Sequence, residues 1–279
     1  MIAKSQATLV NDVRAANQGI VRRYYLSMLS LAVIVLVVGI LSAMLTEAMM
    51  WHLRDAIVNL VLVFVVVNLI GVYMMFGPIR RFMTDQEGFG HAERRIGKLP
   101  LMSAVWAFGL TLAGMLPHHY ATHVLCSDCP ADLPLKLVLY PPVLIVVHGG
   151  FLSLYIYFLI SDYTVALRTR LTSQYGVVFK PGGERFLYKL LIAFAATSIV
   201  PIVLVFAHDF MMRDATVLPV APAPDGMHHV QMPAILAYRV DIIFAMVLAG
   251  LAIVFISRSL TKPMNMLLAT MKRVSQGDL

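Results

Sequence analysis

Six long stretches of the chain are almost entirely apolar, and polar or charged residues gather between them. A helix that crosses about 30 Å of hydrocarbon needs roughly 20 apolar residues, and these stretches have that length or nearly so. The third is the shortest because Pro100 and Pro117 flank it. The expected spans cover residues 25–45, 56–76, 98–116, 137–160, 186–207 and 236–256. This pattern predicts an all-α integral membrane protein with six transmembrane helices.

The composition supports this fold class. Of 279 residues, 59% are hydrophobic and 13% are charged, and the mean hydropathy is +0.80. Soluble domains carry about 45–50% apolar and about 25% charged residues, so a soluble single-domain enzyme is excluded, as is a disordered chain. Two cysteines do not support a disulfide-rich scaffold. The first span is too long, and too far from the start of the chain, to be a cleaved signal peptide.

The distribution of basic residues predicts the orientation of the spans. If residues 1–24 are cytoplasmic, 18 of the 22 Lys and Arg residues lie on the inner side. Cytoplasmic loops of membrane proteins carry such an excess. We therefore expect a multi-pass membrane protein with both termini in the cytoplasm and a net charge of +7 that suits anionic lipids. The basic residues flank the spans and lack exposed aromatic residues between them, so nothing indicates nucleic-acid binding.

The segment after the sixth span, residues 257–279, has a different pattern. Its apolar residues are spaced 4, 3, 4 and 3 apart, which is the heptad pattern of helices that pair in water. These residues are Leu260, Met264, Leu267, Met271 and Val274. Pro263 fits a helix start or a kink, and Gly277-Asp278 indicates a helix end. A short helix with one apolar face needs a partner, and a second copy of the chain can supply it.

Pro263-Met264, Leu267, Val274 and Gly277-Asp278-Leu279 resemble the first helix of a HAMP linker. This signal-relay module follows the last span of many bacterial receptors. The resemblance implies a homodimer in which two chains form a parallel four-helix bundle. The HAMP connector and second helix are missing after Leu279, so we expect the chain to be part of a longer protein. The alternative is an ordinary amphipathic helix beside the membrane.

Six spans before a HAMP linker also resemble the membrane anchor of bacterial class III adenylate cyclases. The segment GPIRRF after the second span, and ERRIGKLP before the third, add to this resemblance. It implies a membrane sensor that passes a helix movement to a cytoplasmic adenylate or guanylate cyclase. The sensor of a histidine kinase or diguanylate cyclase is an alternative, and so is a small transporter or a haem- or quinone-binding protein.

One outer loop holds the strongest candidate for a metal or redox site. His119 and His123 are four residues apart, and Cys126 and Cys129 follow with the two-residue gap of zinc sites. The same cysteines could form a disulfide outside the cytoplasm, or these residues could have no special role. Zinc is thus the candidate cofactor of this loop, and no catalytic constellation is evident in the sequence.

Two polar side chains fall in the middle of expected spans. Asn68 is in the second and His148 is in the fourth, where Gly149 and Gly150 allow another helix or a flat cofactor to come close. Intramembrane polar groups are functional candidates by default, but a bond to a neighbouring helix also accounts for them. Eighteen methionines provide adaptable surfaces, so a lipid-like ligand is the candidate stimulus.

Overall fold

The computed structural model describes residues 17–37, 61–123 and 135–179, apart from the side chains of residues 118–123, 135–141 and 144. It also describes isolated positions, which are 58, 202, 206, 250, 253, 254, 257, 261, 265, 268, 271 and 274–276. The described residues form helices and no strand. The all-helical fold class is therefore confirmed.

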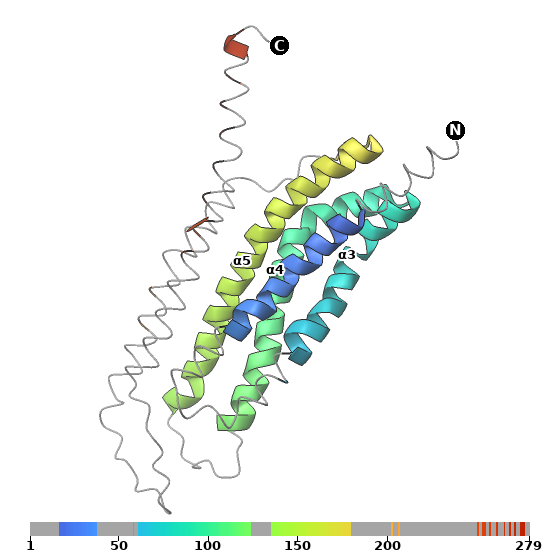
Figure 1. The fold of residues 1–279 in the computed structure, drawn as a ribbon. Helices are drawn as coiled ribbons and strands as arrows, with labels where there is room; N and C mark the ends of the chain where they lie inside the picture. Colours follow the sequence, from blue (N-terminus) through green and yellow to red (C-terminus); the bar gives the residue numbers. More distant parts are fainter. Residues whose placement is uncertain are drawn as a thin grey trace, which may run out of the picture.

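Four helices make up the described body of the protein (Figure 1). The N-terminal helix covers Asn17–Val37. A π-helix, η2 (Val61–Val67), continues directly into α3 (Asn68–Asp85). Two long helices follow, α4 (Phe89–His123) and α5 (Leu135–Tyr175).

All four helices are long and apolar enough to cross a membrane. The candidate spans are Asn17–Val37, Val61–Asp85, Phe89–Pro117 and Ile145–Tyr175. They correspond to the first four expected spans. The fifth and sixth, residues 186–207 and 236–256, lie outside the described ranges except for isolated positions. Among those, Ile202, Phe206, Ile253 and Val254 are helical and exposed.

Contacts between side chains fix the directions of the helices. At one end of the N-terminal helix, Asn17 bonds to the carbonyl of Met83, and toward the other end the carbonyl of Met28 accepts a bond from Asn68. The N-terminal helix is therefore antiparallel to α3. The bond from Tyr163 to the carbonyl of Ile20 continues the same pattern along α5. The result is an up-and-down bundle in which successive described helices alternate in direction. The N-terminal helix is therefore parallel to α4, which it contacts through Tyr24 and Ser103.

Residues with a left-handed backbone conformation lie directly after α3, before α4 and after α5. Between α3 and α4, Gln86 (φ 56°) caps α3 by donating its backbone N–H to the carbonyl of Phe82. Gly88 (φ 72°) then starts α4, since its carbonyl accepts the first backbone bonds of that helix. Gly176 (φ 66°) follows the last residue of α5. Glycine is favoured after a helix because it adopts positive φ without strain.

The helices extend beyond the expected boundaries. The N-terminal helix begins at Asn17, so residues 17–24 are not part of a polar tail, and their Ile20 and Tyr24 are fully buried. Similarly, α3 and α5 continue past residues 76 and 160 into the basic segments that follow.

The third expected span, residues 98–116, is part of a longer helix that runs through both of its prolines. Pro100 and Pro117 both lie inside α4. A proline removes one backbone donor and crowds the preceding turn. Membrane helices tolerate this because packing against neighbouring helices and local adjustment of the backbone compensate for the lost bond. Pro100 is buried in the bundle, where such packing is available.

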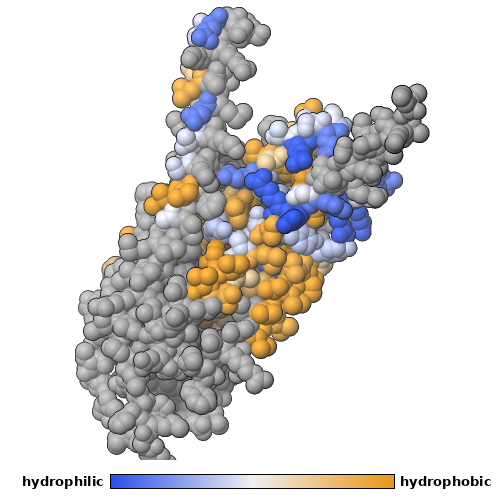
Figure 2. Space-filling model, viewed as in Figure 1, coloured by the Kyte–Doolittle hydropathy of each residue, from blue (hydrophilic) through white to orange (hydrophobic). Residues whose placement is uncertain are grey.

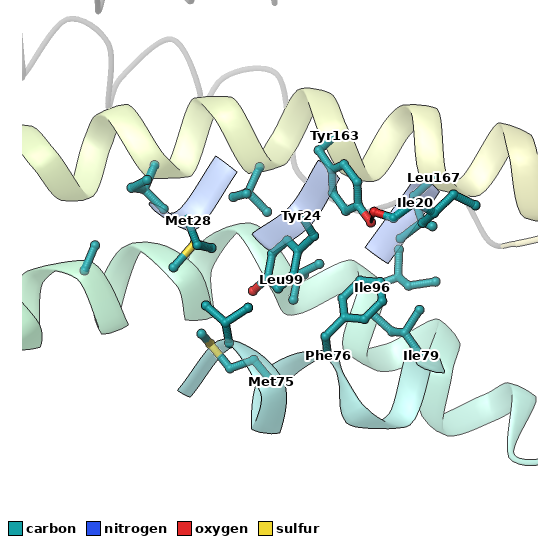
Figure 3. Close-up of a cluster of buried hydrophobic side chains, with 14 of the residues drawn as sticks. Ile20, Tyr24, Met28, Met75, Phe76, Ile79, Ile96, Leu99, Tyr163 and Leu167 are labelled. Atoms are coloured by element: carbon teal, nitrogen blue, oxygen red, sulfur yellow. Dashed lines mark hydrogen bonds between the residues drawn. The ribbon is translucent and has the colours of Figure 1, made fainter. Parts of the chain in front are cut away.

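The core contains large side chains from all four helices (Figure 3). Tyr24 and Met28 of the N-terminal helix lie between Phe76 of α3, Leu99 of α4 and Tyr163 of α5. The ring of Tyr24 stacks on that of Phe76, with 4.9 Å between their centroids. The N-terminal helix is thus an integral part of the bundle and not an appendage.

Glycines allow close helix contacts at three places, which are Gly71, Gly114 and, as described below, Gly149. A Cβ atom on Gly71 of α3 would lie 2.2 Å from the ring of Trp106 on α4. A Cβ on Gly114 would lie 2.9 Å from Phe64, the buried residue of η2. These contacts place the rings directly against the backbone of the facing helix. Small residues serve the same purpose generally in membrane helix packing.

We predict that Gly71→Ala destabilises the bundle by about 1–3 kcal/mol, because the added methyl group overlaps the indole ring of the partly buried Trp106 and forces the ring or the helix to shift. The midpoint of thermal unfolding in mild detergent, followed by circular dichroism, measures the effect. Gly109→Ala is the matched control, since a Cβ there meets no atom within 4 Å. Equal midpoints for the two variants would refute the close contact.

Candidate functional site

Polar side chains join the N-terminal helix to its three neighbours at successive turns. Tyr24 is fully buried, and its hydroxyl is 3.0 Å from the hydroxyl of Ser103 on α4. Two turns further on, Ser30 lies 3.2 Å from the hydroxyl of Tyr155 on α5. We call the bonds between the N-terminal helix and its neighbours the polar ladder. They fix the position of this helix along its axis as well as its rotation.

The polar ladder is densest at the start of the N-terminal helix. Asn17 donates to the carbonyl of Met83 at 3.3 Å and to the hydroxyl of Tyr175 at 2.9 Å, and it accepts a bond from Gln174 at 3.1 Å. Tyr175 also donates to the carbonyl of Met83 at 2.9 Å. One residue pair thus ties together the ends of the N-terminal helix, α3 and α5. It also satisfies a carbonyl in the last turn of α3, which lacks an intrahelical partner.

Asn68 lies where the π-helix gives way to α3. Its side chain is fully buried, and Nδ2 donates to the carbonyl of Met28 at 3.0 Å. Its Oδ1 has no hydrogen-bond partner among the described residues, and neither has Nε1 of Trp106 on α4. Burial of an unpaired polar atom costs free energy, and π-helices often occur at functional sites. Around Asn68 and Trp106 the bundle therefore buries polar atoms that lack hydrogen-bond partners among the described residues.

His148 is half-buried in the middle of α5. The adjacent Gly149 allows α4 to come close, since a Cβ there would lie 3.2 Å from Phe108 and 3.3 Å from Thr111. A helix, rather than a flat cofactor, occupies the space beside Gly149. A Cβ on Gly150 would meet no atom within 4 Å.

Basic side chains surround one end of the bundle. All four helices contribute to them, and Figure 2 shows hydrophilic residues at this end with an apolar surface over the rest of the visible helices. The residues concerned are Arg22, Arg23, Arg80, Arg81, Arg94, Arg95, Lys98, Arg168 and Arg170. The same end holds the Asn17–Tyr175 contacts. This arrangement matches a headgroup region next to a hydrocarbon region.

Several residues that the sequence singled out have no described side chains. His119 and His123 lie in the last turns of α4 by their backbone alone, and Cys126 and Cys129 lie outside the described residues. The zinc and disulfide interpretations therefore stay predictions. In the parts of the chain with described side chains, no three His, Cys, Asp or Glu residues come together as metal ligands.

The expected heptad seam is described at two positions. Met271 and Val274 are helical, and their side chains are 68% and 55% exposed. The other residues that the sequence singled out for the relay lie outside the described residues; they are Leu260, Pro263, Met264, Leu267, Gly277 and Asp278. The two described positions thus present apolar side chains on the surface of a helix.

Sequence reasoning missed most of the polar ladder. Asn17 and Tyr24 fall in the expected N-terminal tail, Tyr163 follows the expected fourth span, and Ser103 looks like an ordinary residue of the third span. One available signal was Tyr24 itself, because a buried tyrosine normally needs a partner for its hydroxyl. The side chains of the polar ladder hold and orient the helices through packing and hydrogen bonds.

We predict that the Tyr24–Ser103 bond contributes about 1 kcal/mol of coupling, the usual net value for a buried hydrogen bond. Tyr24→Phe keeps the ring on Phe76 and removes only the hydroxyl. A double-mutant cycle with Ser103→Ala, measured by unfolding in mixed detergent micelles, isolates the pair. The Ser30–Tyr155 pair, which is less buried, serves as the control and should couple more weakly. Strict additivity at Tyr24 and Ser103 would contradict the prediction.

No protein-family model, curated protein or solved structure matches this chain.

Proposed function

We propose that this chain is the membrane-embedded input module of a bacterial receptor. In this proposal the six-span body responds to a stimulus at the membrane and moves the C-terminal helix, residues 257–279. That helix acts as the first half of a HAMP linker and passes the movement to a cytoplasmic output domain. An adenylate or guanylate cyclase is our first candidate for the output, and a histidine kinase or a diguanylate cyclase is the alternative.

The observation that carries this proposal is the exposed apolar face of the C-terminal helix. Met271 and Val274 are three residues apart on a helix and largely exposed. In water such a face is unfavourable unless it is covered. A second copy of the chain offers the same face in the same register, as the heptad spacing requires. A homodimer at the bacterial inner membrane therefore belongs to the proposal.

The bundle supplies the second requirement of a receptor, which is a body that can change state. A stimulus shifts an equilibrium only when it binds two arrangements with different affinity. The polar ladder holds one definite position of the N-terminal helix. At Asn68, by contrast, Oδ1 has no hydrogen-bond partner among the described residues, so that arrangement is less favourable there. A lipid-like ligand that changes the packing there would favour a second arrangement.

The dimer seam is tested by cysteine crosslinking in inner membranes, with Cys126 and Cys129 replaced by serine. We expect Met271→Cys and Val274→Cys to form crosslinked dimers, because both positions lie on the heptad seam. Asn265→Cys is the matched control, since Asn265 is also helical and exposed but lies away from the seam. The crosslinked fraction should be about fivefold lower there, because the facing residues are farther apart.

The relay itself is tested in a chimera that joins the whole chain to the rest of a HAMP linker and a reporter cyclase. Met271→Asp should change the basal cyclase activity, because a charge in the seam disturbs the pairing, whereas Asn265→Asp should leave it unaltered. If Asn265→Cys crosslinks as well as the seam positions do, or if both aspartate variants behave like the parent, the relay proposal is wrong.

A further inference from the structure

A cluster of arginine and tyrosine side chains lies on the outside of the bundle, where the N-terminal helix meets α3 near the basic end. It consists of Arg22 and Tyr25 from the N-terminal helix and Tyr73, Arg80 and Arg81 from α3. We call it the Arg–Tyr patch. The polar ladder does not use these side chains, and the dimer seam does not include them.

The contact between Arg80 and Tyr73 organises the patch. The guanidinium carbon of Arg80 lies 4.2 Å from the centre of the Tyr73 ring, and Nη2 donates to the Tyr73 hydroxyl at 2.5 Å. Such a cation–π contact restricts an otherwise flexible side chain. Because the Tyr73 oxygen accepts this bond, its own hydrogen stays available for an acceptor outside the protein. The pair therefore presents several donors in a fixed geometry.

The position of the Arg80 guanidinium along α3 is unusual for an arginine beside a membrane. Tyr73 precedes Arg80 by seven residues, which is about 10 Å of helix rise. The charged group therefore reaches back from the basic end toward the apolar part of the helix, whereas arginines normally extend toward water. Ile70, about one turn before Tyr73, and Met74, directly after it, are 57% and 69% exposed, so they would face the hydrocarbon of a membrane. A cation held at this boundary requires a counter-anion.

The N-terminal helix completes the patch from the other side. Tyr25 is near enough to Arg80 and Tyr73 for electrostatic interaction with both. Arg22 is exposed and lies one turn before Tyr25, so the two share a helix face. Arg81 is exposed and acts electrostatically on Tyr73 from α3. The patch therefore combines the guanidinium groups of Arg80 and Arg81 with the phenol rings of Tyr73 and Tyr25. Arg22 adds a third guanidinium group on the same helix face as Tyr25.

We propose that the Arg–Tyr patch binds the phosphate of one anionic phospholipid, whose acyl chains lie along Ile70 and Met74. Arginine donors match the phosphate oxygens, tyrosine rings suit the boundary between headgroups and hydrocarbon, and the exposed apolar residues next to Tyr73 suit acyl chains. A soluble phosphate compound would gain nothing from that apolar surface. This site depends on insertion in a membrane and is independent of the signalling role.

Native mass spectrometry of the purified full chain in mild detergent tests the site. The probes are phosphatidylglycerol and phosphatidylcholine with identical acyl chains. We expect one phosphatidylglycerol to bind about tenfold more tightly than phosphatidylcholine, because basic residues favour anionic headgroups. The double variant Arg80→Gln/Arg81→Gln should lose most of this preference. Tyr73→Phe keeps the ring but loses the hydroxyl, and it should weaken binding about threefold.

The double variant Arg94→Gln/Lys98→Gln is the matched control. Both residues are exposed basic groups at the same end, but they lie on α4. Equal losses in the two double variants would show only diffuse attraction to the basic end and would overturn the proposal. Displacement of the lipid by millimolar inorganic phosphate would overturn it as well, because the apolar contacts would then contribute nothing. If the Arg80/Arg81 variant does not fold, Tyr73→Phe and Arg80→Lys decide the question.

Discussion

The lack of water in the bilayer interior is the constraint on which this structure depends. A polar group in hydrocarbon must find its partner within the protein. The hydroxyls of Tyr24 and Tyr163 meet this demand by reaching across to neighbouring helices, as does the amide of Asn68. Each bond fits only one position of the N-terminal helix along its axis. Apolar packing alone would discriminate less strongly, because lipid tails are as apolar as the helix surfaces.

This constraint distributes stability unevenly along the bundle. Near the basic end, Asn17 and Tyr175 satisfy each other and the carbonyl of Met83. Toward the other end, η2 has π-helical geometry, and Asn68 and Trp106 bury polar atoms that lack partners among the described residues. Regions with fewer satisfied contacts open or rearrange at lower cost. A stimulus that acts on the packing would therefore have its largest effect in the half away from the basic end.

Sequence reasoning predicted the helical class and four apolar helices that are long enough to cross a membrane, because length and apolarity are local properties. It did not predict where the helices end. Pro100 reads as a boundary in isolation, yet packing keeps α4 continuous through it. Asn17 reads as part of a tail, yet its partners are 66 and 158 residues away. The sequence singles out Asn68 as a polar residue inside an expected span. Its partner, the carbonyl of Met28, depends on which helices pair, and pairing is not a local property of the sequence.

The two ends of the bundle therefore suit different tasks in a receptor. Movement can be transmitted only if one part stays fixed while another moves. The Asn17–Tyr175 contacts hold the basic end together, and a phospholipid on Arg80 and Tyr73 would also fix its depth in the membrane. A displacement in the half away from the basic end would then rotate or translate whole helices. The helices would not deform individually, because close contacts such as Gly71 against Trp106 hold their shapes. In the proposed receptor, a helix that leaves such a body would carry that displacement to the output domain.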